Sequence, residues 1–125
     1  MVYVCKSWLF YNDKKLNAAA NQNSAHIWWK RNAQGSHVAK IHQVLRAYFT
    51  DGSFRYPHLK HLVADLSEDT YDGETATAVG MYKYIQHHDA GESLLNWQGH
   101  IDSVCGIKTV RSMDAWFRSR FPFSP

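Results

Sequence analysis

Residues 36–50 read SHVAKIHQVLRAYFT, and this stretch decides the fold class. Its apolar side chains recur at steps of three and four residues, which places them on one face of an α-helix. They are Val38, Ile41, Val44, Leu45, Tyr48 and Phe49. Ser36 is a suitable N-cap residue, and Asp51-Gly52 predicts the end of the helix because glycine enters left-handed geometry at little cost. The opposite side carries a polar stripe of His37, Lys40, Gln43 and Arg46.

Working outward toward the N-terminus, good helix formers fill residues 14–20, and residues 25–32 resume the pattern after a polar interruption. One bent helix or two short ones fit this region. Residues 2–11 are rich in β-branched and aromatic side chains, which predicts a strand or a buried extended arm.

Toward the C-terminus, Pro57 suits the first turn of a short helix that we expect to end near Ser67. Residues 67–74 contain four acids and no apolar period, so we expect an exposed loop. Residues 74–88 fit either a helix or a strand, and helix is our prediction. Helical spacing returns over residues 94–105, and Ser112 is expected to cap a final helix.

Together these elements predict a mainly α fold, in which residues 1–125 form a compact single domain of about five helices with an N-terminal strand or extended arm. Cys5 and Cys105 are a hundred positions apart without a C-x-x-C motif, which is typical of a reducing compartment. We therefore expect a cytoplasmic protein. The apolar run at the start is interrupted by Lys6 and is too short for a signal peptide or a membrane span, so no membrane partner is expected.

The charges are sorted by position along the chain. Residues 1–64 carry nine basic and two acidic side chains, a net charge of +7, whereas residues 65–104 carry eight acids and one lysine, a net charge of −7. The last 21 residues return to +3. Charge sorted in this way can produce separate fields, each able to attract a different partner.

The basic half suggests a partner of DNA or RNA. The sequence fits the helix-turn-helix layout, with a first helix at residues 25–31, a short turn at 32–35 and a second helix from Ser36. In this layout the second helix meets the base edges. The candidate nucleic-acid-binding residues are Lys30, Arg31, Ser36, His37, Lys40, Gln43, Arg46, Arg55 and Tyr56. Lysine and arginine would neutralise phosphates, while the aromatic rings interleaved with Arg46 and Arg55 could stack on bases.

The acidic half supports an alternative, a protein-binding inhibitor or adaptor. Its acids could imitate a row of phosphates and dock on a basic nucleic-acid-binding protein or complex, because complementary charge sets the association rate and the choice of partner. The candidate residues are Asp65, Glu68, Asp69, Asp72, Glu74, Asp89 and Glu92. Exposed aromatic side chains are a second route to the same function.

Motifs for catalysis are missing from the sequence. It contains no G-x-S-x-G, no Walker loop, no H-E-x-x-H and no zinc-finger array, although eight histidines leave a metal-dependent hydrolase open. We therefore expect no cofactor and a small, non-enzymatic regulatory protein. In its small size and polarised charge the chain resembles the small inhibitory proteins that phages and mobile elements carry. No sequence motif supports this resemblance.

Overall fold

The computed structural model describes residues 2–125, which are mainly helical and contain no strand. The four α-helices in this part of the chain are α1 (Lys14–Ala19), α2 (Ser36–Thr50), α3 (Gly73–Asp89) and α4 (Ile107–Arg120). Three short 3₁₀ helices join them, namely η1 (Asn23–Ala25), η2 (Trp29–Arg31) and η3 (Pro57–Val63). The prediction of a mainly α fold is confirmed.

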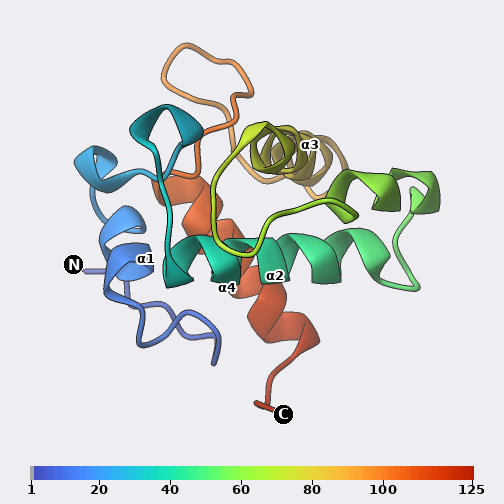
Figure 1. Ribbon diagram of the computed structural model, residues 1–125, viewed down its shortest axis with the longest axis horizontal. Coiled ribbons are helices and arrows are strands. Elements are labelled where there is room, and N and C mark those ends of the chain that lie inside the picture. Colours follow the sequence, from blue (N-terminus) through green and yellow to red (C-terminus); the bar gives the residue numbers. More distant parts are fainter. Residues whose placement is uncertain (1) are drawn as a thin grey trace.

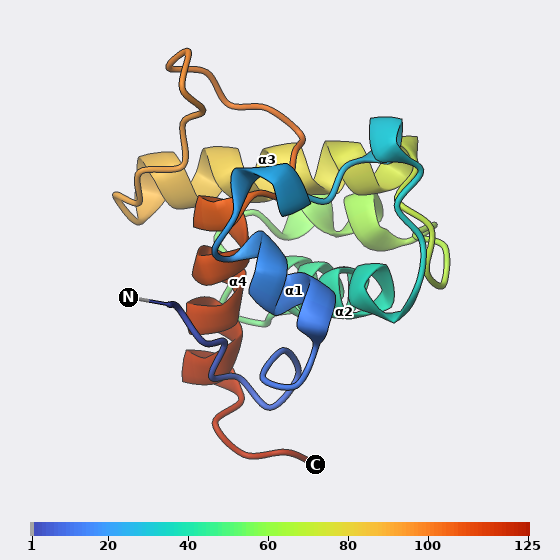
Figure 2. The ribbon, with the colours of Figure 1, turned by 90° about the vertical axis from the view of Figure 1, so that its left-hand side faces the viewer.

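Helix α2 lies at the centre of the core, as its apolar face predicts. The side chains of Val38, Ile41, Val44 and Leu45 have no exposed surface, and each such burial contributes about 1.5–3 kcal/mol. The helix packs against η3, α3 and α4, and Figure 1 shows α4 crossing behind it. Figure 2 shows the shorter α1 beside it, close to its first turns.

Helix α3 begins at a capping box formed by Asp72 and Thr75. The carboxylate of Asp72 accepts a hydrogen bond of 3.1 Å from the backbone N–H of Thr75, while the Thr75 hydroxyl lies 3.2 Å from the Asp72 backbone nitrogen. A cap of this kind satisfies N–H groups that the first helical turn leaves free. The choice of helix over strand for residues 74–88 is therefore confirmed.

The N-terminal segment is extended over residues 2–6 and forms turns over residues 7–12, so the alternative of a strand is wrong for residues 2–11. Side-chain amides supply the hydrogen bonds that a neighbouring strand would otherwise supply. Asn21 accepts from the backbone N–H of Tyr3 and donates to its carbonyl, both at 2.7 Å, and Asn17 accepts from the N–H of Cys5 at 2.8 Å. With its backbone groups satisfied by α1 and its flank, the arm needs no strand partner.

The helix predicted over residues 25–32 is not formed, so the helix-turn-helix layout is wrong. Ile27 instead makes an isolated antiparallel bridge to Cys105, with both N–H···O distances at 2.9 Å. Only the single turn of η2 follows, and Asn32 ends it in the left-handed conformation at φ 53°. A long-range pairing therefore overrides the local helical pattern.

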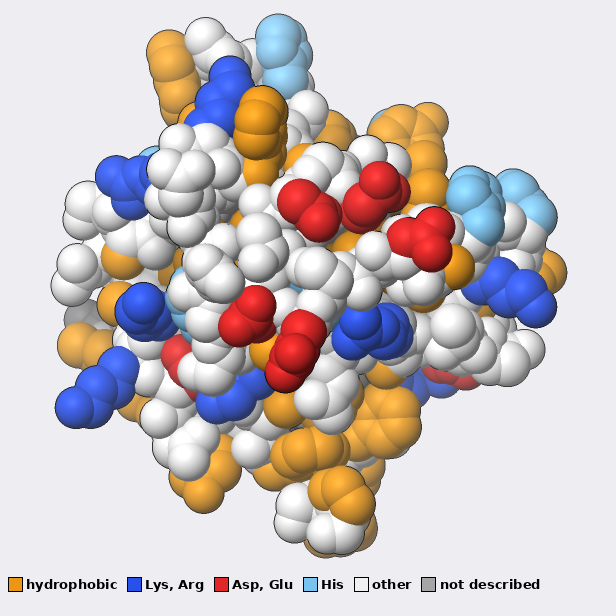
Figure 3. Space-filling view, viewed as in Figure 1, with side chains coloured by type: hydrophobic (Ala, Val, Ile, Leu, Met, Phe, Trp, Pro, Cys, Tyr) orange, Lys and Arg blue, Asp and Glu red, His pale blue; other side chains and the backbone are white. Residues whose placement is uncertain are grey.

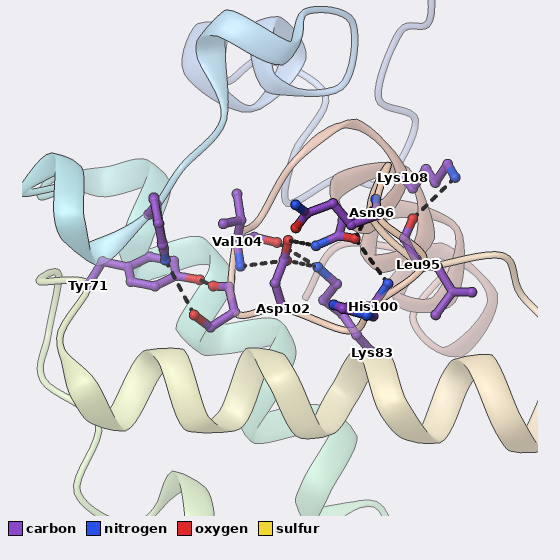
Figure 4. A network of polar contacts seen from close by, with 11 residues as sticks. Tyr71, Lys83, Leu95, Asn96, His100, Asp102, Val104 and Lys108 are labelled. Atoms are coloured by element: carbon purple, nitrogen blue, oxygen red, sulfur yellow. Dashed lines mark hydrogen bonds and ion pairs between the residues drawn. The ribbon is translucent and has the colours of Figure 1, made fainter.

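The helix predicted over residues 94–105 is also wrong, because residues 90–106 form a loop. This loop projects away from the helices at the top of Figures 1 and 2. Figure 4 shows the contacts that hold it: the ammonium of Lys83 reaches Asp102 at 2.5 Å, and Asn96 donates to the same carboxylate at 3.0 Å. Burial would raise the pKa of Asp102, but the hydrogen bonds from Lys83 and Asn96 outweigh it and hold that pKa below its usual value.

Three helix ends differ from the predictions. Gly35 and not Ser36 is the N-cap of α2, since Ser36 is already its first residue. Ser112 does not cap the final helix, because α4 already begins at Ile107 and the Ser112 hydroxyl lies inside the core, 2.7 Å from Tyr82 Oη. The short helix at Pro57 is present as η3 but ends at Val63, before the expected Ser67. The loop predicted after it is confirmed, since no helix forms again before Gly73.

Candidate anion-binding cleft

Two adjoining hollows lie where α1 approaches the start of α2. The larger has a volume of about 540 Å³ and is lined by Lys15, Ala18, Ala25, His26, Ile27, Arg31, Ala33 and His37. The smaller has a volume of about 320 Å³ and is lined by Asn12, Asp13, Lys14, Lys15, Gly35, Ser36, His37 and Lys40. Lys15 and His37 belong to both, so we treat the two hollows as one surface and call it the basic cleft.

The charges lining the basic cleft are mostly positive. Its permanent cations are Lys14, Lys15, Arg31 and Lys40. The one acidic lining residue is Asp13, which is paired with Lys40 at 3.1 Å. His26 and His37 also line the cleft. When charges of one sign line a cleft with low-dielectric walls, the electrostatic field is concentrated inside it. The basic cleft therefore attracts anions.

The N-terminus of α2 opens into the smaller hollow. The Gly35 N-cap has no side chain to bind the free N–H groups, and the first turn carries no acid. Within residues 2–125, the backbone N–H groups of Ser36 and His37 have no hydrogen-bond acceptor. Unpaired N–H groups and the helix dipole together favour an anion at this position.

His37 is the least ordinary residue of the basic cleft. Only 6% of its surface is exposed, yet its ring makes no hydrogen bond or ion pair with residues 2–125. The ring lies against the backbone of Gly35, where a Cβ atom would come within 3.3 Å of Nδ1. Burial, and then the positive charge of Lys15, lower the pKa of His37. A nearly buried imidazole without a protein partner has the capacity to bind a ligand in the cleft.

Two tryptophans stand next to the basic cleft along the chain. The ammonium of Lys30 lies 5.0 Å from the ring centre of Trp28 and 5.7 Å from that of Trp29, within the range of cation–π interactions. Trp29 is 44% exposed. The guanidinium of Arg31 donates to the carbonyl of Ser24 at 2.6 Å, which fixes its position at the edge of the larger hollow.

The structure brings together only part of the predicted nucleic-acid set. Arg31, Ser36, His37 and Lys40 line the cleft, and Lys30 precedes Arg31 in η2. The other four residues lie elsewhere, because Gln43 is on the exposed face of α2 and three more contact other segments. Arg46 donates to the carbonyl of Leu66 at 3.1 Å, while Arg55 and Tyr56 both approach Asp89, at 3.7 and 2.7 Å.

The acidic segment lies beside α2 and does not form a separate face. The N–H of Gly35 donates to the carbonyl of Asp69 at 3.0 Å, and Gln34 forms an isolated bridge with Thr70. Figure 3 shows acidic and basic side chains on the same face of the molecule. The two charged halves of the sequence therefore share this face, and the expectation of separate fields does not hold for it.

The acidic candidates also divide into two groups. Asp65, Glu68 and Glu74 are exposed. Asp72 caps α3, Asp89 pairs with Arg55, and Glu92 accepts hydrogen bonds from Ser112 at 2.9 Å and from Gln86. Only the first group and the half-buried Asp69 leave their carboxylates free of the contacts described here, so the row of seven acids is not continuous.

Lys14, Lys15 and His26 line the cleft but were not predicted as site residues. The two lysines are in the first turn of α1, where the sequence shows ordinary helix formers and no motif. Only the packing of α1 against the start of α2 places them opposite His37. The signal that could have found them is the adjacent pair of lysines that follows the N-cap Asp13.

No known protein family, curated protein or solved structure matches this chain. Among residues 2–125, no three His, Cys, Asp or Glu side chains are grouped so that they could hold a metal ion. Every helix in that range is too short or too polar for a bilayer-spanning segment.

Proposed function

We propose that the protein is a small regulator that binds nucleic acid through the basic cleft. The observation that carries this proposal is the charge of the cleft, where four permanent cations and two histidines face one acid. Lysine and arginine supply most of the affinity of proteins for a phosphate backbone. The cleft also has the volume of a small-ligand site, for which about 300–1,000 Å³ is usual.

A single strand fits this surface better than a duplex. The start of α2 is not free to enter a major groove, because the Asp69 carbonyl is bound to the N–H of Gly35. The first helix of the predicted helix-turn-helix is also missing. Single-strand binders combine a basic groove with aromatic rings on which bases stack. Trp29, with Lys30 beside its ring, offers such a platform next to the cleft.

The experiment is a titration of a fluorescent single-stranded oligonucleotide, followed by anisotropy at several salt concentrations. Contact with about three phosphates predicts that affinity falls roughly twentyfold between about 50 and 200 mM salt. The double variant K14A/K15A should lose most of this affinity, whereas the matched control K60A/K108A changes two exposed lysines outside the cleft. Equal affinities for the two double variants, or binding that ignores salt, would exclude the proposal.

A second candidate function, protein binding, is favoured by Trp97. This side chain is 91% exposed at the tip of the loop formed by residues 90–106. Hydrogen bonds hold the tip in place. The side-chain oxygen Oδ1 of Asn96 accepts from the backbone N–H groups of Gln98 and His100, at 2.9 and 3.0 Å. Tryptophan on an ordered support is a frequent anchor of protein interfaces. Residues 91–107 contain no lysine or arginine, so a phosphate backbone is not attracted there.

Pull-down from a lysate, with and without nuclease, separates the two candidates. A protein-binding function predicts capture that survives nuclease and is lost in W97A but kept in Y84A, which changes another exposed aromatic residue. The acidic route is tested with D65K/E68K/E74K, since these three residues are exposed and leave the Asp72 cap of α3 intact. Capture that disappears with nuclease in every variant removes the protein-binding candidate.

A further inference from the structure

We infer that the smaller hollow of the basic cleft binds a terminal phosphate, so that the protein prefers a phosphorylated end of a nucleic-acid strand. This inference rests on the proposed function and names the part of the nucleic acid that the cleft recognises. The hollow lies at the N-terminus of α2 and is lined by Lys14, Lys15, Ser36, His37 and Lys40, together with Asp13.

The net charge of the smaller hollow matches a terminal phosphate. Three lysines and one aspartate give it a formal charge of +2. A phosphate monoester carries about −1.5 to −2 charges at neutral pH, whereas each phosphodiester inside a strand carries one. The terminal group is therefore neutralised more completely, and its third free oxygen can accept one further hydrogen bond.

The donors for these oxygens are already in place and unused. The backbone N–H groups of Ser36 and His37 have no acceptor within residues 2–125, and neither the Ser36 hydroxyl nor the His37 ring forms a hydrogen bond there. These groups belong to the first turn of a 15-residue helix, where the dipole favours negative charge. His37 is the independent sign of a ligand. It is only 6% exposed and its ring has no hydrogen-bond partner within residues 2–125. In that range Trp8 Nε1 is the fully buried side-chain nitrogen without a partner, so the ring nitrogens of His37 stay accessible from the hollows that it lines.

The larger hollow can take the nucleoside that follows the phosphate. Its walls include Ala18, Ala25, Ile27 and Ala33, and the Arg31 guanidinium lies at its edge. Apolar walls with a planar cation suit a base and its sugar. Because Lys15 and His37 line both hollows, a phosphate bound to them would stand between the two.

The test compares one single-stranded oligonucleotide in three forms, with a 5′-phosphate, with a 3′-phosphate and with neither, at fixed salt. We expect at least one phosphorylated form to bind about tenfold more tightly than the unphosphorylated one. The form with the higher affinity identifies the end of the strand. A nucleoside 5′-monophosphate and its nucleoside, titrated separately by NMR, test the same preference without a strand.

The variants are S36D and its matched control Q43E, which adds the same charge to the exposed face of α2 outside both hollows. An acid at the first helical position stabilises α2, so S36D should fold, yet it repels a phosphate at the free N–H groups. We expect S36D to lose the preference for the phosphorylated end and Q43E to keep it, with thermal unfolding confirming that both are folded. A preference that persists unchanged in S36D overturns the inference.

The outcomes also separate this inference from the proposed function. If all three forms bind equally with steep salt dependence, the terminal-phosphate inference is wrong and nucleic-acid binding stands. If the nucleoside monophosphate binds through its phosphate but no oligonucleotide does, the phosphate site stands and the proposed function is wrong. If neither binds, both are wrong.

Discussion

The Nζ atom of Lys40 lies 3.1 Å from Oδ2 of Asp13, and this ion pair joins α2 to the residue that caps α1. The other carboxylate oxygen of Asp13 accepts from the N–H of Leu16 at 3.0 Å. Asp13 therefore has two roles: it stabilises the start of α1, and it cancels one positive charge in the basic cleft.

Replacing Asp13 with asparagine should separate these roles. Asparagine is as good an N-cap as aspartate, and a partly exposed ion pair contributes only about 0–1 kcal/mol, so the D13N protein should keep its stability to within about 1 kcal/mol. With the acid removed and Lys40 released, oligonucleotide affinity should rise by roughly threefold to tenfold. Anisotropy titration measures this change. D13A is the control, since it should show the same gain in affinity but lose about 1 kcal/mol more of stability through the missing cap.

Oligonucleotide binding should strengthen as the pH is lowered from about 8 to 6, because of His37. Burial and Lys15 lower the pKa of this imidazole in the free protein, so it is neutral at pH 7, whereas Asp13 opposes that shift. A phosphate beside the ring would favour the protonated form, so binding takes up a proton and affinity grows as the pH falls. Lys14, Lys15, His26, Arg31 and Lys40 also line the cleft.

The control for the pH effect is H37Q, titrated with an oligonucleotide that has no terminal phosphate. Its affinity should change less between pH 8 and 6 than that of the unmodified protein. Identical pH profiles for the two proteins would show that His37 does not take up the proton.

Folding stability should fall in mild acid because of the buried His42. Its ring nitrogens lie 2.8 Å from the Ser67 carbonyl and 2.7 Å from Thr75 Oγ1. Burial lowers the pKa of His42, and the nearby charge of Arg46 acts in the same direction. Unfolded histidine takes up a proton near pH 6.5, whereas the folded ring does so only at lower pH. The free energy of unfolding is therefore retained above about pH 6.5 and decreases below it, by up to about 1.4 kcal/mol per pH unit.

Urea unfolding at a series of pH values measures this decrease. The slope should be smaller in H42N, which has no proton to take up at this site, even though that variant starts from a lower stability. His37 contributes a similar effect, so the H37Q protein serves as the parallel control. A slope that is the same with and without His42 would contradict the prediction.

Removing the carboxylate of Asp114 should release the N-terminal arm. This group is 1% exposed and accepts hydrogen bonds from Tyr3 Oη at 2.8 Å and from the N–H groups of Lys6 and Ser7, both at 2.9 Å. D114A leaves these donors without their acceptor, which should cost about 3 kcal/mol or more in urea unfolding. Ala115 is exposed on the same helix, so A115S is the matched control. A loss below about 1 kcal/mol in D114A would show that the arm is held by other contacts.

The helices that the sequence predicted well are those with local causes. The apolar spacing of α2 lies within the helix, and the Asp72 cap of α3 lies next to it. Gly52 does not take the left-handed conformation expected of it, although α2 ends nearby at Thr50. The wrong helices at 25–32 and 94–105 have distant causes. The bridge between Ile27 and Cys105 joins the two segments to each other, and no local pattern contains that pairing.

The same distinction applies to the candidate site. Arg31, Ser36, His37 and Lys40 were predicted because they are close to one another in the sequence, and they do line the cleft. Lys15 was missed because it reaches His37 only through the packing of α1. Arg46 was predicted from its place in the polar stripe, but it turns to the Leu66 carbonyl, which belongs to a loop 20 residues away.

Residues 12–40 alone line both hollows. Contacts with the rest of the molecule hold them in place, among them the β-bridges of Ile27 with Cys105 and of Gln34 with Thr70, and the hydrogen bond from Arg111 to the Ala20 carbonyl. Natural selection can consequently rewrite the outer faces of α3 and α4 without altering ligand choice, as long as these contacts survive. Descendants of this sequence should therefore conserve the stretch around its lysine pair and diversify elsewhere.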